Sequence, residues 1–244
     1  MGTSAGCLQT ALTVPARFRG PEGTANGGWV AGTLAATLPG TLDRDHPVEV
    51  TLHRPVPLDT ELAVGHVANS GTLSLDGQVL AEAIPVAEDL TPPPFVPFPD
   101  AARAEAGFAG LTGHHPVPGC FVCGLRGPGD GLRIFPGPVP GTGLIAAGWR
   151  VPMTITEPDG TVPDALVWAA LDCPSGWANV DAGGPGLLGR MTARLFRRVY
   201  PGGTYSVVAR ATGRERRKLF GTSAVYEVDG TLVAAAKATW IIPA

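Results

Sequence analysis

The chain has 244 residues, which is long enough for one large or two small domains with a hydrophobic core. Hydrophobic residues make up 44 % of it, a proportion that excludes an intrinsically disordered protein. The 18 basic and 21 acidic side chains give a net charge of −3, and this near balance argues against nucleic acid or an anionic membrane as a partner.

The N-terminal residues contain no basic segment followed by an apolar run, and no stretch of about 18 uninterrupted apolar residues occurs. We therefore expect a cytoplasmic protein without a membrane span. In that compartment the four cysteines, at positions 7, 120, 123 and 173, are expected to be reduced. The strong excess of arginine over lysine is typical of a GC-rich bacterial genome.

The first predicted element is a short helix within residues 25–39 (ANGGWVAGTLAATLP). Its larger apolar side chains recur at helical spacing, and its small residues leave a smooth face for close packing. Asn26 is a suitable N-cap and Pro39 a stop signal. Because the segment is apolar on all sides, we expect the helix to be buried.

Four strand-like segments follow this helix, at residues 47–54, 61–68, 72–75 and 78–85. Apolar residues alternate in the first two, and the Asp76-Gly77 pair before the last is a typical signal for a two-residue hairpin. The first part of the chain is therefore predicted to be a helix followed by a meander of strands.

The second half repeats this order. An apolar helix is predicted at 163–173, with Pro163 near its first position and Pro174 just beyond its end. Predicted strands follow at 187–199, 204–212, 219–228 and 231–242.

Two pairs of segments carry the repeat at the level of residues. LHRPVPLDTELAV at 52–64 is similar to LFRRVYPGGTYSV at 195–207, and DGQVLAEA at 76–83 is similar to DGTLVAAA at 229–236. Two copies of one helix-and-sheet unit explain this similarity, with a chance likeness of apolar hairpins as the alternative.

A proline-rich linker separates the two copies. The predicted domains are a first unit at 1–87, the linker at 88–135 and a second unit at 136–244. Prolines keep the linker extended, and its phenylalanines Phe95, Phe98 and Phe121 are expected to pack on the body of the protein, because they are costly to leave in water.

Three motifs in this order resemble the TesB-like (thioesterase II) acyl-CoA thioesterases, a double hot-dog family. They are NGGWVAG at 26–32, WAALD at 168–172 and the C-terminal segment 221–242 with its Asp-Gly turn. The resemblance implies an α+β fold, with two antiparallel sheets each wrapped around a central apolar helix. It also implies a homo-oligomeric acyl-thioester hydrolase that acts on acyl-CoA or acyl-carrier-protein substrates and needs no cofactor.

The sequence departs from the family pattern in two places. The position of the family's catalytic glutamine falls on Ala238, between Lys237 and Thr239, and the family's Asp-His pair falls near Met191 and Thr192. Only the catalytic aspartate, at Asp172, matches. A non-catalytic acyl-binding protein and a hot-dog hydratase or dehydratase therefore remain as alternative functions.

The predicted catalytic residues are Asp172, Gly27, Gly28 and Thr239. Asp172 lies near the predicted end of an apolar helix, where burial would make it a general base or a nucleophile. The alternative is a structural aspartate bonded to the turn at 174–176. Gly27 and Gly28 offer helix N-terminal amides to the thioester carbonyl, or serve only close packing.

The predicted substrate-binding residues are Asn26, Trp29, Trp168, Arg216 and Arg217. The two arginines belong to a basic turn that could contact the phosphates of coenzyme A, or could be a solvated hairpin tip.

The Cys120-x2-Cys123 pair, with His114 and His115 nearby, has the spacing of a zinc knuckle. A second cysteine pair is absent, and so the sequence favours free thiols and no metal over a zinc site or a redox pair. Cys173 is a candidate nucleophile only if the first half supplies an activating histidine.

Overall fold

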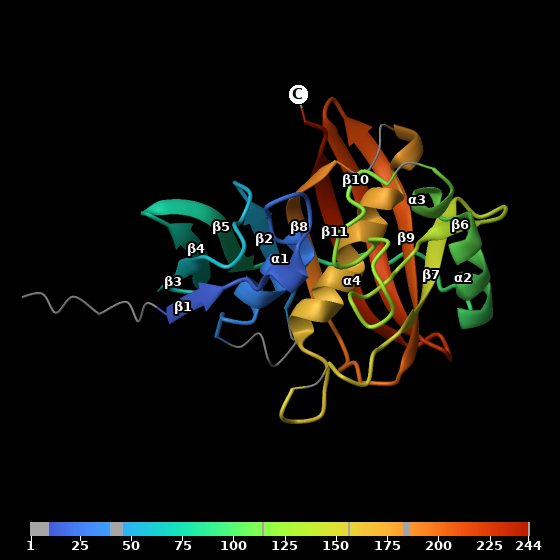
Figure 1. Cartoon of the computed structure of the whole chain (residues 1–244), viewed down its shortest axis with the longest axis horizontal. Coiled ribbons are helices and arrows are strands. Elements are labelled where there is room, and N and C mark those ends of the chain that lie inside the picture. The colour runs from blue at the N-terminus through green and yellow to red at the C-terminus, as the bar shows by residue number, and fades with distance from the viewer. Residues whose placement is uncertain (1–9, 40–45, 114, 156, 183–185, 244) are drawn as a thin grey trace, which may run out of the picture.

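The computed structural model describes residues 10–39, 46–113, 115–155, 157–182 and 186–243. Within them, eleven strands form one antiparallel sheet. Two helices, α1 (Gly27–Ala35) and α4 (Asp164–Trp177), pack against the sheet and against each other (Figure 1). No helix in the described residues is both long and apolar enough to cross a membrane.

The strands of the first half surround α1 in the chain. They are β1 (Thr10–Thr13), β2 (Val48–Leu52), β3 (Glu61–Val67), β4 (Ser70–Leu75) and β5 (Gln78–Pro85). The predicted hairpin joins β4 to β5, and both Asp76 and Gly77 have the positive φ angles that such a turn requires.

The strands of the second half are β6 (Gly137–Val139), β7 (Leu144–Arg150), β8 (Leu187–Leu195), β9 (Thr204–Glu215), β10 (Lys218–Glu227) and β11 (Leu232–Ile241). All eight predicted strands form. No predicted element corresponds to β1, β6 or β7, nor to the short helices α2 (Phe98–Ala104) and α3 (Ala109–Thr112).

The strand order reveals the internal repeat. Outward from the middle of the sheet, one half runs β2-β5-β4-β3-β1 and the other runs β8-β11-β10-β9-β7, with β6 added at the edge. Each half thus consists of a strand, a helix and four further strands in the same arrangement. The domain boundaries at 87 and 135 remain predictions.

The expectation of two separate sheets is not met. β2 pairs with β8 in antiparallel register, with Val48 opposite Ala193 and Val50 opposite Met191, so that the halves form one continuous sheet. Two separate sheets would each leave an edge strand with unpaired backbone groups at this point, and the β2–β8 pairing satisfies both edges.

Glycines let α1 and α4 approach closely. A Cβ atom at Gly28 would lie 2.4 Å from the Cβ of Asp172, and one at Gly32 would lie 2.7 Å from both the Cα of Ala165 and the Cβ of Trp168. Real Cβ atoms do not come so close to their neighbours, and so any side chain at these positions would force the helices apart.

We expect Gly32→Ala to lower the free energy of unfolding by about 1–3 kcal/mol, the usual cost of overpacking a core. Gly127→Ala is the matched control, because a Cβ there meets no atom within 4 Å. Urea unfolding of both variants measures the difference. Equal stability of the two variants would contradict the close contact of the helices.

The predicted end of the second helix at Pro174 is wrong, because α4 continues to Trp177 with Pro174 inside it. Every residue from 165 to 177 is buried, and this packing outweighs the roughly 3 kcal/mol that an internal proline costs. The hydroxyl groups of Ser223 and Ser175 donate to the carbonyls of Leu171 and Asp172, both at 2.7 Å.

The linker packs on the body of the protein, as predicted. Phe121 is buried, Phe95 meets the edge of Tyr226, and Phe98 lies under the guanidinium of Arg150. The segment around Phe121 runs beside α4, and this contact brings it to the site described next.

Candidate functional site

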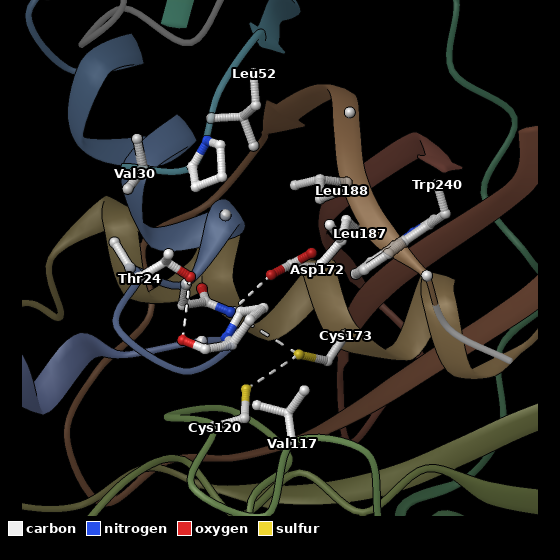
Figure 2. Close-up of a pocket in the computed structure, with 18 of the residues that line it drawn as sticks. Thr24, Val30, Leu52, Val117, Cys120, Asp172, Cys173, Leu187, Leu188 and Trp240 are labelled. Atoms are coloured by element: carbon white, nitrogen blue, oxygen red, sulfur yellow. Dashed lines mark hydrogen bonds between the residues drawn. The ribbon is translucent and has the colours of Figure 1, made fainter. Parts of the chain in front are cut away.

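A cavity of about 350 Å³ lies where the N-terminus of α1, the linker segment 115–123 and the C-terminal half of α4 meet (Figure 2). The ends of β8 and β11 and the residues after β2 complete its wall. The wall is mainly apolar, with contributions from Val30, Leu52, Val117, Leu188 and Trp240. Its buried polar members are Asn26, His115 and Asp172.

Asp172 lies in this wall with only 1 % of its surface exposed. Its Oδ2 accepts hydrogen bonds from the Asn26 side chain at 2.8 Å and from the Gly28 backbone N–H at 3.0 Å. Its Oδ1 is buried and has no hydrogen-bond partner in the described part of the chain. Burial raises the pKa of Asp172 to about 7, although the bond from Gly28 opposes this shift.

This geometry removes one alternative for Asp172. Because α4 runs on to Trp177, residues 174–176 are helical rather than a turn, and the carboxylate reaches across to α1 instead. The position of Asp172 is therefore the middle of a buried helix–helix contact, not a helix end.

Most of the backbone N–H groups in the first turn of α1 already donate hydrogen bonds within the protein. The Gly28 N–H donates to Asp172, and the Trp29 N–H donates at 2.9 Å to Oδ1 of Asn26, the N-cap. Gly27 lines the cavity, and its N–H has no partner among the described residues. Gly27 therefore remains as the predicted donor to the thioester carbonyl, because the Gly28 N–H already donates to the buried carboxylate of Asp172.

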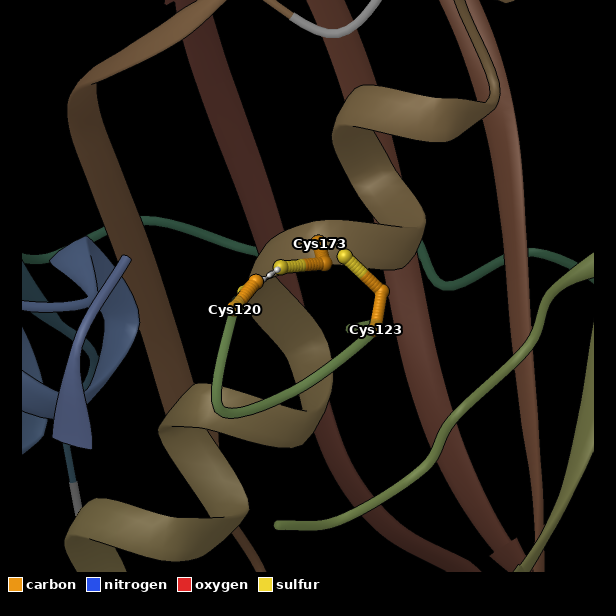
Figure 3. A group of neighbouring side chains, drawn as sticks. All are labelled: Cys120, Cys123 and Cys173. Atoms are coloured by element: carbon orange, nitrogen blue, oxygen red, sulfur yellow. Dashed lines mark hydrogen bonds between the residues drawn. The ribbon is translucent and has the colours of Figure 1, made fainter. Parts of the chain in front are cut away.

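Three cysteines meet where the linker passes α4 (Figure 3). Cys120 and Cys123 come from the linker and Cys173 from α4, and the Sγ atoms of Cys120 and Cys173 lie 3.6 Å apart. Hydrogen bonds from Cys123 and Cys173 hold the pKa of Cys120 well below its usual range. The same bonds to Cys120 raise the pKa values of the other two thiols.

The histidines considered as partners of these cysteines do not join them. The Val117 N–H donates to Nδ1 of His115 at 3.0 Å, so that the ring carries its proton on Nε2 and donates it to the Cys123 carbonyl at 3.0 Å. Both nitrogens are thereby engaged. His114 lies outside the described residues.

Six of the predicted site residues do not line the cavity: Gly28, Trp29, Trp168, Arg216, Arg217 and Thr239. Trp29 stacks on Phe18 with ring centroids 4.4 Å apart, and Trp168 packs against Gly32 between the helices. Thr239 is not in the cavity wall, because side chains alternate along β11 and its neighbour Trp240 takes the face toward α4.

Arg216 and Arg217 are exposed in the turn between β9 and β10. The N–H of Ile242 donates to the Arg217 carbonyl, which ties this turn to the end of β11. Trp240 and Ile241, just before it, line the cavity. The basic turn therefore lies beside the C-terminal end of β11, the same end of that strand that lines the cavity.

A helix against each half of an antiparallel sheet, duplicated in one chain, defines the double hot-dog class. Solved structures agree: the chain matches a candidate thioesterase from Novosphingobium aromaticivorans at a TM-score of 0.64 and 14 % identity, over 97 % of this chain and 96 % of that one. It matches a tesB protein from Mycobacterium avium subspecies paratuberculosis at 0.61 and 15 %, over 97 % and 93 %. A candidate thioesterase II from Thermobifida fusca gives 0.63 and 14 %, over 97 % and 94 %.

No family model and no curated protein sequence matches the chain. The structural likeness nevertheless covers nearly the whole chain, and it shows that the chain has the hot-dog fold of the thioesterase II and TesB-like proteins. The resemblance noted in the sequence is thereby confirmed at the level of the fold.

Proposed function

We propose that this protein hydrolyses acyl thioesters. The observation that carries the proposal is the buried carboxylate of Asp172 in the wall of a mainly apolar cavity. Two N–H donors hold one of its oxygens, and the other has no partner among the described residues. The descriptions of the structural neighbours from Novosphingobium aromaticivorans and Thermobifida fusca as candidate thioesterases support the same chemistry.

In the proposed reaction, the acyl chain lies against the apolar wall formed by Val30, Leu52 and Leu188. The thioester carbonyl accepts a hydrogen bond from the N–H of Gly27, which stabilises the charge that develops on its oxygen. Asp172 takes a proton from a water molecule whose oxygen attacks the carbonyl carbon; the carbon–sulfur bond then breaks, and the leaving thiolate takes that proton from Asp172. Alternatively, Asp172 attacks the carbonyl carbon itself, the thiolate leaves and is protonated by water, and a water molecule then hydrolyses the resulting mixed anhydride and restores the carboxylate.

Asn26 and Gly28 are positioning residues in this scheme. Their two donors fix the Asp172 carboxylate through Oδ2 and so leave Oδ1 as the atom that accepts the proton. This arrangement stands in for the glutamine of the family, whose position falls on the buried Ala238.

The proposed carriers are coenzyme A and acyl carrier protein, which share a phosphopantetheine arm. Arg54 lines the cavity, and Arg216 and Arg217 lie on the turn tied to the end of β11. Guanidinium groups bind phosphates well, and so these side chains are suited to the carrier's phosphates. We also propose a cytoplasmic location and a homo-oligomeric state.

The double variant Arg216→Ala, Arg217→Ala is expected to raise KM for acyl-CoA by about three- to tenfold and to leave kcat unchanged, because exposed charge pairs contribute modestly. Steady-state kinetics at low and high salt measures this effect, which added salt should reduce. Arg103→Ala, on α2 and outside the cavity wall, is the control. An unchanged KM at low salt would place phosphate binding elsewhere.

A panel of acyl-CoA esters of increasing chain length, with free coenzyme A separated and measured by chromatography, tests the function. Hydrolysis of at least one chain length supports the proposal. The alternative is a non-catalytic acyl-binding protein, which Ala238 in place of a glutamine favours; it predicts binding of acyl-CoA without release of coenzyme A.

A further inference from the structure

The three thiols at the cavity wall have no part in the proposed hydrolysis, yet they are arranged as a set (Figure 3). Cys120, Cys123 and Cys173 are buried and free of disulfide bonds, and their sulfur atoms all lie within 4.8 Å of one another. In a tetrahedral zinc site with Zn–S bonds of about 2.3 Å, the sulfur atoms are about 3.8 Å apart. The Cys120–Cys173 distance of 3.6 Å is close to that spacing.

We propose that Cys120, Cys123 and Cys173 bind one zinc ion, whose fourth position opens to the cavity and takes a water molecule. All three cysteines line the cavity, so that the open position faces its interior. Three protein ligands with one solvent ligand is the arrangement of reactive rather than purely structural zinc sites.

The turn from Cys120 to Gly124 is wound so that both of its sulfur atoms face α4. The N–H of Val122 donates to Sγ of Cys120 at 3.4 Å, and the N–H of Gly124 donates to the Cys120 carbonyl at 3.0 Å. A Cβ atom at Gly124 would lie 2.3 Å from that carbonyl oxygen, and so the turn requires glycine. Cys173 on α4 then supplies the third sulfur.

Two of the three sulfur atoms accept a hydrogen bond from an N–H group. The Val122 N–H donates to Cys120 at 3.4 Å, and the Nδ2 of Asn26, which also donates to Asp172, donates to Cys173 at 3.9 Å. N–H donors of this kind stabilise thiolates bound to a metal and orient them. Three uncharged thiols in contact would gain less from such donors, since each thiol also has a proton of its own to place.

The fourth ligand is not a described protein side chain. Both ring nitrogens of His115 are engaged elsewhere, and the carboxylate oxygens of Asp172 are not among the ligand atoms that converge with the three sulfur atoms. Among the described residues, the three cysteines are the single group whose ligand atoms converge in this way. A solvent ligand from the cavity completes the proposed coordination.

The test is the metal content and the cobalt spectrum of the full-length protein. Protein purified without added chelator is expected to contain about one zinc per chain. After removal of zinc, one equivalent of Co²⁺ should produce the intense near-ultraviolet absorption of thiolate-to-metal charge transfer, together with visible bands of tetrahedral cobalt. Chelation should lower the melting temperature, because metal binding stabilises the folded state.

The variants Cys120→Ser, Cys123→Ser and Cys173→Ser are each expected to lose zinc and the cobalt absorption, whereas Cys7→Ser is expected to keep both. Circular dichroism shows whether each variant folds, and the wild-type cobalt spectrum decides the question if the serine variants do not. Wild-type protein that binds neither Zn²⁺ nor Co²⁺ would overturn the proposal, as would a disulfide between Cys120 and Cys173 seen by mass spectrometry. Loss of zinc from Cys7→Ser would mean that Cys7 is the fourth ligand, and the proposal of a solvent ligand at that position would then be wrong.

Discussion

Asp172→Asn is expected to lower kcat for acyl-thioester hydrolysis by about 10²- to 10⁴-fold, the usual contribution of a general base. KM should stay nearly unchanged, because the acyl chain and the carrier contact other residues. Asparagine is almost isosteric, and its Oδ1 can accept the same two bonds, from the Asn26 side chain and the Gly28 N–H. The melting temperature should therefore stay close to that of the wild type.

The control for this variant is Asp181→Asn, at an exposed aspartate just beyond α4. It removes the same charge without touching the cavity and should leave kcat as it is. The opposite pattern for Asp172→Asn, with lower stability and full activity per folded molecule, would make Asp172 a structural residue.

Asn26→Ala is expected to have the second-largest effect, because Asn26 has two functions at once. Its Oδ1 caps α1 by accepting from the Trp29 N–H, and its Nδ2 donates to Asp172. Loss of the cap should lower the free energy of unfolding by about 1–2 kcal/mol. Loss of the donor should lower kcat by about tenfold or more, since a hydrogen bond to a charged group contributes about 1.5–3 kcal/mol.

Asn26→Ser separates the two functions. Serine is a good N-cap, but its single short hydroxyl cannot both cap α1 and reach Asp172. We expect most of the stability to return and kcat to stay low, as measured by urea unfolding and steady-state kinetics on the same preparations. Recovery of activity together with stability would mean that Asn26 acts through the helix alone.

The periodicity of the sequence predicted the elements of the repeat well, because each helix and each hairpin has a local signal. The pairing of β2 with β8 had none, since it joins strands from different copies and depends on how the two halves meet. At Pro174 a local signal was present but gave the wrong helix end. Proline usually ends a helix, but here the burial of the residues that follow it stabilises the helix by more than the proline costs.

In the candidate site too, single residues had a local signal in the sequence, whereas the contacts between distant residues had none. Asp172 stood out as a charge beyond the first turn of an apolar helix, and Asn26 as an N-cap, but their contact spans 146 positions of the chain and no local pattern indicates it. The aromatic residues Trp29 and Trp168 had a strong apolar signal that does not distinguish a core position from a cavity wall. Similarly, the Cys120-x2-Cys123 spacing could not reveal that Cys173 lies beside it.

A single-turnover experiment is the most direct test of whether Asp172 hydrolyses a thioester bound in this cavity. The enzyme, in excess over a radiolabelled acyl-CoA that it binds, is quenched at successive times, and the free fatty acid is separated and counted. We expect complete conversion by the wild type and a rate constant about 10²- to 10⁴-fold lower for Asp172→Asn at equal binding. Full binding of the acyl-CoA by the wild type with no fatty acid formed, or equal rate constants for the two proteins, would contradict this expectation.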